Sequence, residues 1–497
     1  MALGDLIDGI IEPFAPATAA RRRAARVGLE AIRKYDAAGR DRRTSGWSRP
    51  SSGPNAEGQR GIAMLRNGAR DLVRNNKYAA AAVRQIVANM VGDGIAPQFT
   101  HEDPKVAALA QDAWNRWAES PVDGFGDFYE VQKLAARGAV EGGETLLLWE
   151  ADAGGPDGSV QVLEGDYLDL TRNQVRGEGR ERIIQGVQFA GRSLRSGYWL
   201  FDDHPGEAFS AATNSRFTPA AHVDHVFERL RADQVRGVSW LAAVALTLRD
   251  IADIEDAVRL KKKVEACLAL VLTPEQGGSG SPLTSEGEAQ ANGQPGLETL
   301  RPGMIFRARP GEDVHTINPS STGDGVDFIR QQLAAVSANL TPYYLMTGDT
   351  TSATYTSLRA ANLGHHALLD DWQQNMMIPR TCLPGVRRRM RRLALETGDK
   401  RVLQVRTNWA LPIRRVIDPM KDLMAEVFEI RAGLKNLGKA LAERGMNGEE
   451  QLRDIARMNK LIDELGLALD TDPRRLTDSG VLQAAAGYLV PKAEQAA

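Results

Sequence analysis

The sequence predicts an α+β fold that is mainly α-helical and divided into several sub-domains. A chain of 497 residues is too long for one ordinary hydrophobic core. Apolar residues recur at helical spacing over 58–91, whereas short apolar runs bounded by turn residues fill the stretch from 145 to 228. Beyond Gly237, residues 238–268 contain no Gly or Pro, and helical character dominates again.

The composition is that of an ordinary globular protein, with 42% hydrophobic and 25% charged residues. The net charge of −2 argues against a sequence-specific DNA-binding domain, because such domains usually carry net positive charge. Cys267 and Cys382 lie far apart without CxxC spacing, which excludes a disulfide framework and a cysteine zinc site and fits a reducing cytoplasm. The apolar runs are too short to span a membrane, so we expect no membrane partner.

The first 236 residues divide into a basic arm, 1–56, and an α+β part, 57–236. Between 18 and 49 the arm carries ten Lys and Arg residues against three acidic ones. This excess is typical of an arm that touches nucleic acid or a neighbouring subunit, and also of a solvated tail; both interpretations stay open. In the α+β part we expect two helices over 58–91, helices at 104–118 and 127–141, and strands at 145–149, 159–163, 183–190, 196–201 and 222–228.

Two long helices are predicted to flank a loop-rich insertion. The first covers 238–268, about 45 Å if fully helical, with Leu241, Val244, Leu248, Ile251 and Val258 on one seam and polar Glu255 and Lys262 at its later positions. The second covers 325–340, with Ile329, Leu333, Val336 and Leu340 on one stripe. Between them, Glu275–Glu298 is rich in Gly, Ser, Gln and Pro, and short strands are expected near 303–308 and 313–317.

The rest of the chain is predicted to be helical with one polar loop. The loop, 347–354, follows Pro342 and precedes a helix at 355–378, which we expect to end before Pro379. A strand is expected near 402–406, and helices at 418–433, 436–444, 447–466 and 480–489.

The signals for catalysis are weak. Asp250, Asp253 and Asp256 fan across about 120° of a helix surface, which is typical of a solvated acidic face rather than a metal site. His365 and His366 are adjacent and point in different directions, and His222 and His225 are expected to be structural. The sequence contains neither a phosphate-binding GxxxxGK[ST] loop nor a GxSxG elbow. We therefore predict no catalytic residues, no metal and no cofactor, and a protein that is not an enzyme.

Several short motifs, taken in order, resemble the portal proteins of lambda-like tailed phages over roughly residues 20–460. They are Leu65–Asn76, Val91–Ile95, Asp224–Phe227, Gln234–Leu241, Leu300–Ile305, Gly348-Asp349 and Tyr355–Arg359. Two departures are Thr356, where the family more often has Ser, and 275–298, which matches poorly.

The resemblance implies a portal fold with a wing, a stem helix pair, a clip insertion and a helical crown. These correspond to wing 57–236, stem helices 237–266 and 325–340, clip 267–324, a tunnel loop, long helix and rest of the wing in 341–416, and crown and tail 417–497. It implies a ring, usually of twelve subunits, at a capsid vertex of the virion, assembled in the host cytoplasm. The implied partners are double-stranded DNA without sequence specificity, the large terminase, the major capsid protein and head–tail connector proteins.

The resemblance also places the site residues. DNA would face the tunnel loop, which comprises Thr347, Gly348, Asp349, Thr350, Thr351 and Ser352. The terminase and connectors would meet the clip at Gln276, Ser281, Arg301 and Arg307. The stem would pack through Leu241, Leu248, Ile251, Ile329 and Leu333. Small polar loop residues suit a channel through which DNA slides, because each added cation would strengthen non-specific binding.

Two other functions compete with a portal. The first is a capsid-associated or tail structural protein without a DNA channel, which a channel wide enough for a duplex would exclude. The second is a nuclease that uses the Asp250, Asp253 and Asp256 face, which requires a divalent metal and DNA cleavage.

Overall fold

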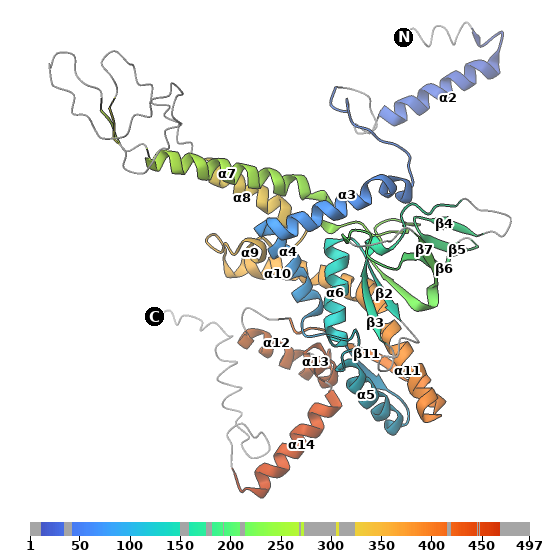
Figure 1. Ribbon diagram of the computed structural model, residues 1–497, viewed down its shortest axis with the longest axis vertical. Coiled ribbons are helices and arrows are strands. Elements are labelled where there is room, and N and C mark those ends of the chain that lie inside the picture. The colour runs from blue at the N-terminus through green and yellow to red at the C-terminus, as the bar shows by residue number, and fades with distance from the viewer. Residues whose placement is uncertain are drawn as a thin grey trace, which may run out of the picture. The chain divides into compact units, whose positions relative to one another are not determined.

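The computed structural model describes residues 11–33, 42–149, 159–174, 181–191, 193–208, 214–267, 270–272, 305–307, 324–414, 419–444, 446 and 448–467. The chain divides into two units, Met1–Gly53 and Pro54–Ala497. The first unit contains helix α2, Pro16–Arg33, on which Arg21, Arg22 and Arg23 are exposed. The second unit contains the other helices and strands (Figure 1). None of the described helices is long and apolar enough to cross a membrane.

Four helices form the first part of the second unit, close to their predicted positions. They are α3, Pro54–Asn75; α4, Lys77–Val91; α5, Pro104–Ala118; and α6, Phe128–Glu141. A side-chain oxygen caps the start of three of them, from Asn76, Asp103 and Asp127. Their buried faces join one core, in which the rings of Trp114 and Phe128 pack edge to face at 5.4 Å.

Three small sheets accompany these helices. In the first, β2, Thr145–Trp149, lies between β3, Val160–Glu164, and β8, Val223–Val226. The second is an antiparallel meander of β4, Arg182–Ile184; β5, Val187–Ala190; β6, Leu194–Phe201; and β7, Ser215–Pro219. The third pairs β1, Ala96–Thr100, with β11, Arg406–Ala410. Strands β1 and β7 were not predicted.

Two strand predictions were wrong. The single strand expected at 183–190 is a hairpin, because Gln185 and Gly186 turn the chain with φ of 50° and 83°. The strand expected at 402–406 is a 3-10 turn, Lys400–Gln404, and β11 follows it.

The two long helices pack side by side (Figure 1). The first, α7, spans Ala245–Cys267 and begins later than predicted, because a 3-10 turn, Trp240–Ala243, precedes it. The second, α8, spans Asp324–Ser337. We call α7 and α8 the helix pair. Beyond α7 and before α8, the short strands β9, Leu270–Leu272, and β10, Ile305–Arg307, pair in parallel. The strand expected at 313–317 lies outside the described residues.

The helix expected to end before Pro379 continues through it. Helix α10, Tyr355–Trp372, leads into a π-helix, η5, Gln373–Cys382, and then into α11, Leu383–Thr397. Leu383 N–H donates to Ile378 O, five residues back. The wider π turn relieves the clash that a proline ring makes with the carbonyl one α-helical turn earlier.

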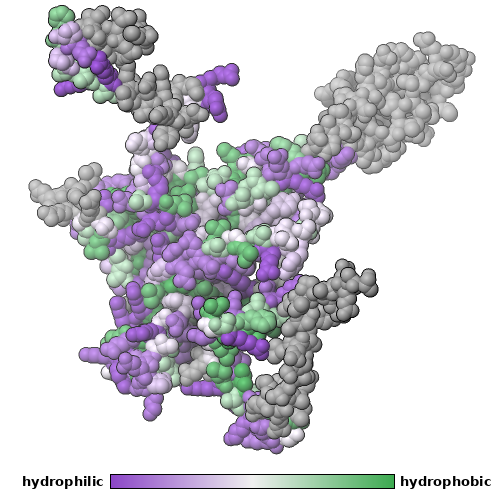
Figure 2. All heavy atoms as spheres, turned by 180° about the vertical axis from the view of Figure 1, so that it is seen from behind, coloured by the Kyte–Doolittle hydropathy of each residue, from purple (hydrophilic) through white to green (hydrophobic). Residues whose placement is uncertain are grey.

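The C-terminal helices lie where they were predicted. They are α12, Pro419–Arg431; α13, Leu437–Glu443; and α14, Gly448–Glu464. Gln98 Nε2, on β1, donates to the backbone oxygen of Met446 at 3.0 Å. The helix expected at 480–489 lies outside the described residues. On the face in Figure 2, hydrophilic side chains cover most of the surface and hydrophobic ones gather in smaller groups between them.

A buried carboxylate, Glu144, joins the helices, the strands and the segment that leads to the helix pair. Its Oε1 accepts from Arg66 Nη2 at 2.7 Å, and Arg236 Nε lies 2.9 Å from both oxygens. His225 Nε2 lies 3.0 Å from Oε2, which also accepts the backbone N–H of Gly237 at 3.0 Å. The exposed fractions of the Glu144, Arg66 and Arg236 side chains are 0%, 1% and 2%. We call these groups the Glu144 network.

The two buried arginines of the Glu144 network are balanced by Glu144 and by Asp166 beside it. Burial by itself raises the pKa of Glu144, but Arg236, the His225 hydrogen bond and Arg66 together hold the pKa well below its ordinary value. Burial lowers the pKa of His225 to about 4, so this imidazole is uncharged at neutral pH. Asp166 Oδ1 lies 3.1 Å from Arg66 Nη1, so two carboxylates face the two buried arginines.

Two glycines let the backbone reach this network. A Cβ atom on Gly237 would lie 1.9 Å from Gly143 O, and Gly143 itself has a φ of +93°. Because only glycine fits such an approach, the turn before β2 and the segment before the helix pair are locked together beside Glu144.

We expect Glu144→Gln to destabilise the chain by about 3–5 kcal/mol, because buried Arg236 loses the carboxylate that it faces and Arg66 keeps only Asp166. Urea denaturation measures this free energy of unfolding. The matched control is Glu141→Gln, which removes a carboxylate paired with Arg137 at 3.2 Å near the surface and should cost about 1 kcal/mol or less. Similar losses for both variants would show that the Glu144 network does not hold these elements together.

Candidate functional site

The packed half of the helix pair lies in the main core. Leu241, Leu248, Ile251 and Leu333 are buried there, and Ile329 is partly buried against it. These are the five residues predicted to line the pair, and the structure brings all of them into one core.

Between Asp256 and Lys263, the described side chains of the outer half of α7 are mostly polar and exposed, as the sequence predicts. The change from the packed half of α7 to the exposed half falls at Glu255. Its carboxylate accepts from Tyr78 Oη at 2.6 Å and pairs with Lys77 at 2.7 Å. Asp250, Asp253 and Asp256 are exposed, in line with a solvated acidic face. The packed half thus ends at an ion pair with α4.

The predicted polar loop is shorter than expected and is fastened at its base. Helix α9, Tyr343–Thr347, includes Thr347, and Gly348 ends it in the left-handed conformation, with φ of 73°. Thr354 starts α10 through a capping box with Ser357. The loop is therefore 348–354, and its Thr350, Thr351 and Ser352 are exposed.

Asp349 holds this loop. Its Oδ1 accepts from Thr351 N at 3.0 Å and from Thr351 Oγ1 at 2.6 Å, and its Oδ2 accepts from Tyr343 Oη at 3.1 Å. Arg330, on α8, lies 3.4 Å from Asp349 Oδ2 and donates to Thr351 Oγ1 at 3.3 Å. The helix pair thus contacts the loop directly, through Arg330 on α8.

The sequence predicts a mobile loop whose Asp349 repels phosphate, and this arrangement corrects both expectations. The Thr351 hydrogen bonds lower the pKa of Asp349, so this side chain is charged at neutral pH, but Arg330 offsets its charge. It is therefore a fastening for the loop rather than a free repelling charge, and the loop is not freely mobile at its base. Sequence reasoning missed Tyr343, six residues before Asp349, and Arg330, 19 residues before it, because no local pattern marks either as a partner of this loop.

Of the predicted clip residues, the structure describes only the backbone of Arg307, in β10. Gln276, Ser281 and Arg301 lie outside the described residues. The pairing of β10 with β9 brings residues 305–307 beside residues 270–272, near the start of the insertion between α7 and α8.

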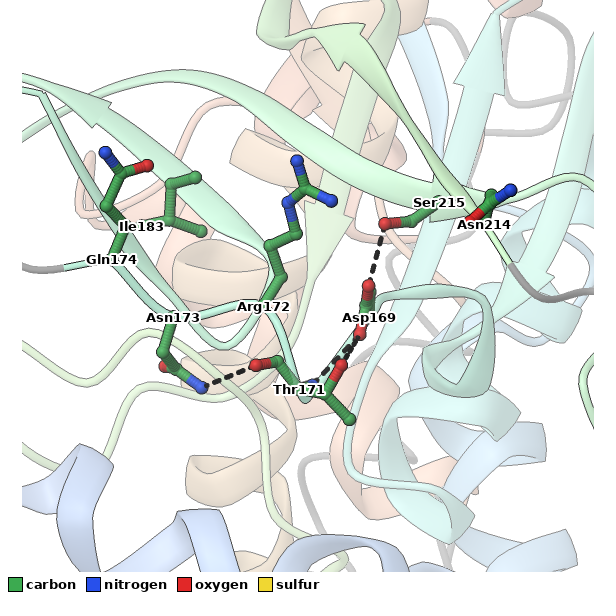
Figure 3. A pocket seen from close by; sticks show the side chains of 8 residues that line it. All are labelled: Asp169, Thr171, Arg172, Asn173, Gln174, Ile183, Asn214 and Ser215. Atoms are coloured by element: carbon green, nitrogen blue, oxygen red, sulfur yellow. Dashed lines mark hydrogen bonds between the residues drawn. The ribbon is translucent and has the colours of Figure 1, made fainter.

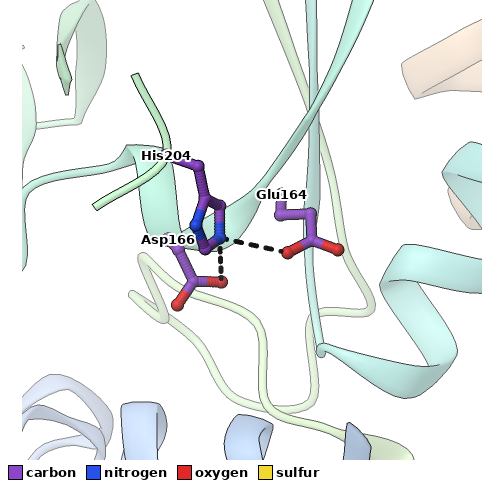
Figure 4. A group of neighbouring side chains, drawn as sticks. All are labelled: Glu164, Asp166 and His204. Carbon is purple, nitrogen blue, oxygen red and sulfur yellow. Dashed lines mark ion pairs between the residues drawn. The ribbon is translucent and has the colours of Figure 1, made fainter. Parts of the chain in front are cut away.

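One cluster has the composition of a metal site but already holds a cation. Glu164, Asp166 and His204 offer ligand atoms within 4.8 Å of one another (Figure 4). However, Arg70 Nη2 lies 2.5 Å from Glu164 Oε2 and 2.6 Å from Asp166 Oδ2. These are the same oxygens that face His204, so the geometry favours an ion-pair cluster over a metal site.

An open polar pocket of about 530 Å³ lies beside Asp169 (Figure 3). The Asp169 carboxylate accepts from Thr171 Oγ1 and Ser215 Oγ, each at 2.7 Å. Its oxygens are occupied by donors from Thr171, which follows η2, Gly165–Tyr167, and from Ser215 on β7. Burial by itself raises the pKa of Asp169, but its hydrogen bonds with Thr171 and Ser215 lower the pKa overall, which favours a structural carboxylate over a general base.

The comparisons with known proteins agree with the predicted class. The model described as "Phage portal protein, lambda family" matches residues 40–373, which is more than half of the chain. No curated protein matches the sequence.

Three solved structures are similar at low identity. A chain of "Neck of native GTA particle computed with C12 symmetry" has 16% identity and a TM-score of 0.38, with 80% of this chain and 95% of that chain covered. A chain of "Virion of native gene transfer agent (GTA) particle" has the same identity and TM-score, with 80% and 96% covered. A chain of "Neck of empty GTA particle computed with C6 symmetry" has 17% identity and a TM-score of 0.36, with 81% of this chain and 97% of that chain covered.

The family match defines the chain as a phage portal protein. More narrowly, it belongs to the lambda family of phage portal proteins. The predicted fold class, α+β and mainly α, and the predicted role as a portal subunit of a phage-like particle are confirmed.

We expect Asp349→Ala to loosen loop 348–354 without unfolding the chain. The Thr351 N–H loses its acceptor in this variant, so exchange of the Thr351 amide hydrogen should speed up by about tenfold or more. Because the loop is exposed, loosening it leaves the packing of the core unchanged. The Tm should therefore change by about 2 °C or less. Hydrogen exchange with mass spectrometry measures the exchange rate of the Thr351 amide hydrogen.

Thr350→Ala is the matched control, because the Thr350 side chain makes no hydrogen bond with the described residues, and its exchange pattern should stay unchanged. Equal exchange in the two variants would mean that Asp349 does not fasten the loop.

Proposed function

We propose that copies of this chain close into a ring at one vertex of a phage-like capsid and that double-stranded DNA passes through the ring. Loop 348–354 would face the DNA. The observation that carries this proposal is the make-up of that loop, whose exposed residues Thr350, Thr351 and Ser352 are small and uncharged while its one acid is paired with Arg330.

Such a loop suits a surface past which DNA must slide. Lys and Arg contacts to phosphate release counterions and strengthen binding to any sequence. Hydroxyl groups touch the backbone without that added affinity. Because α8 holds the loop through Arg330, the loop keeps its place while DNA moves.

The remaining parts fit the same plan. The insertion between α7 and α8, which contains the paired strands β9 and β10, is the proposed docking lobe for the large terminase and later for head–tail connector proteins. Helices α12 to α14 are the proposed crown, and the major capsid protein is the proposed partner at the vertex. The ring would act as a structural channel of the virion and perform no catalysis.

The test of the DNA channel uses Thr350→Lys with Ser352→Lys. These two side chains make no hydrogen bond with the described residues, whereas Thr351 does and is left in place. Two cations per subunit, multiplied around the ring, should raise the affinity of the purified assembly for a short duplex by about tenfold or more at low salt. The slope of log K against log salt should steepen by about 0.9 for each additional phosphate that the new lysines neutralise.

The matched control adds the same charges to α5, through Ala108→Lys with Asn115→Lys, both at exposed positions. It should leave the affinity and the salt slope close to those of the unmodified assembly. Equal effects from the loop and α5 variants would place loop 348–354 away from the DNA.

A further inference from the structure

A pocket of about 350 Å³ lies where β6, β8 and η5 meet, and arginines dominate its lining. Arg195 comes from β6, Arg229 from the segment after β8, and Arg380 from η5. The guanidinium carbons of Arg195 and Arg380 lie 5.4 Å and 4.9 Å from the centre of the Phe227 ring. Two of the three cations are therefore gathered at one aromatic side chain.

The positive charge of this pocket is not balanced by the lining residues. The one acid among them is Asp224, and it is already engaged by Arg388 at 2.5 Å and by Trp149 Nε1 at 2.6 Å. His225 also lines the pocket, and it is uncharged at neutral pH. Three cations thus remain for a ligand of opposite charge.

The arginines keep donors available. Arg195 donates to Tyr198 Oη at 3.2 Å and to Val235 O at 3.2 Å, and it lies 2.9 Å from His225 Nδ1. Arg380 donates through Nη1 to Phe227 O, and its other N–H groups have no acceptor among the described residues. Arg229 has neither a hydrogen bond nor an ion pair with any described residue.

The like charges also act on one another. Burial, followed by the charges of Arg195 and Arg229, lowers the pKa of Arg380. An anion between these side chains would replace their repulsion with charge-assisted hydrogen bonds, which are the strong class of hydrogen bond.

We propose that this pocket binds a phosphate group through Arg195, Arg229 and Arg380. A carboxylate brings one negative charge and two oxygens, whereas a phosphate monoester or inorganic phosphate carries about −1.5 to −2 at pH 7 and three acceptor oxygens. The planar fork of arginine matches the spacing of phosphate oxygens. The phosphate could be free in solution or belong to the end of a DNA strand.

Binding here would reach the Glu144 network. Because Arg195 donates to His225 Nδ1, the proton of this neutral imidazole sits on Nε2 and is donated to Glu144. A phosphate that fixes Arg195 therefore also fixes the ring that contacts Glu144. Phosphate binding should stabilise the folded chain, and it requires neither a ring nor a DNA channel.

The test measures the Tm and the heat of binding of the full chain titrated with inorganic phosphate, with sodium chloride adjusted to hold the ionic strength constant. We expect 10 mM phosphate to raise the Tm by about 3 °C or more. Arg229→Gln should weaken phosphate binding by about tenfold, and it should not unfold the chain because Arg229 is exposed and has no described partner.

Arg231→Gln is the matched control, because this arginine pairs with Glu57 at 2.6 Å and does not line the pocket. It should bind phosphate as the unmodified chain does. Equal binding by the Arg229→Gln variant and the unmodified chain, or no binding by either, would overturn the proposal.

A second arm separates the two sources of phosphate. A short DNA oligonucleotide with a 5′-phosphate is compared with the same oligonucleotide carrying a 5′-hydroxyl. Tighter binding of the phosphorylated strand that Arg229→Gln abolishes assigns the pocket to a DNA end. Equal binding of the two strands, together with Arg229-dependent binding of inorganic phosphate, assigns it to the free ion.

Discussion

The buried carboxylate of Glu144 is the interaction on which the positions of the surrounding elements depend. It binds Arg66 from α3, Arg236 and the Gly237 amide from the segment before the helix pair, and His225 from β8. Because each group is buried, breaking one contact leaves a polar or charged group with fewer partners in a place that water does not reach. A helix, a sheet and the base of α7 are therefore fixed together at one point.

The position of loop 348–354, which we propose faces the DNA, depends on the base of α7. The packed half of α7 holds α8 through the core, and Arg330 on α8 holds Asp349. Rigidity at the base and small uncharged residues at the tip are compatible, because the fastening uses Asp349 and Thr351 and leaves Thr350 and Ser352 free of described side-chain hydrogen bonds. A chain whose net charge is close to zero can in this way let DNA slide past without binding it tightly.

Local patterns predicted most of the helices, since an amphipathic stripe and its caps lie within one segment; α5 has the predicted bounds of 104–118. The hairpin at Gln185 and the π-helix at Pro379 escaped prediction, because a positive φ at glutamine and a widened turn depend on the surrounding packing. The buried residues of the first long helix were predicted from heptad-like spacing, and those of the second from an apolar stripe at helical spacing. The Glu144 network was not, because its members are far apart in the sequence and their residue types are common.

The central claim is that the chain forms a ring whose DNA channel is lined by loop 348–354. A cryo-electron microscopy reconstruction of the purified assembly tests it most directly. We predict a closed ring with a channel wide enough for a DNA duplex, narrowest where Thr350 and Ser352 of each copy point inward. A ring whose channel wall is formed by other residues, with loop 348–354 on its outer surface, would contradict this claim, as would an assembly without a channel.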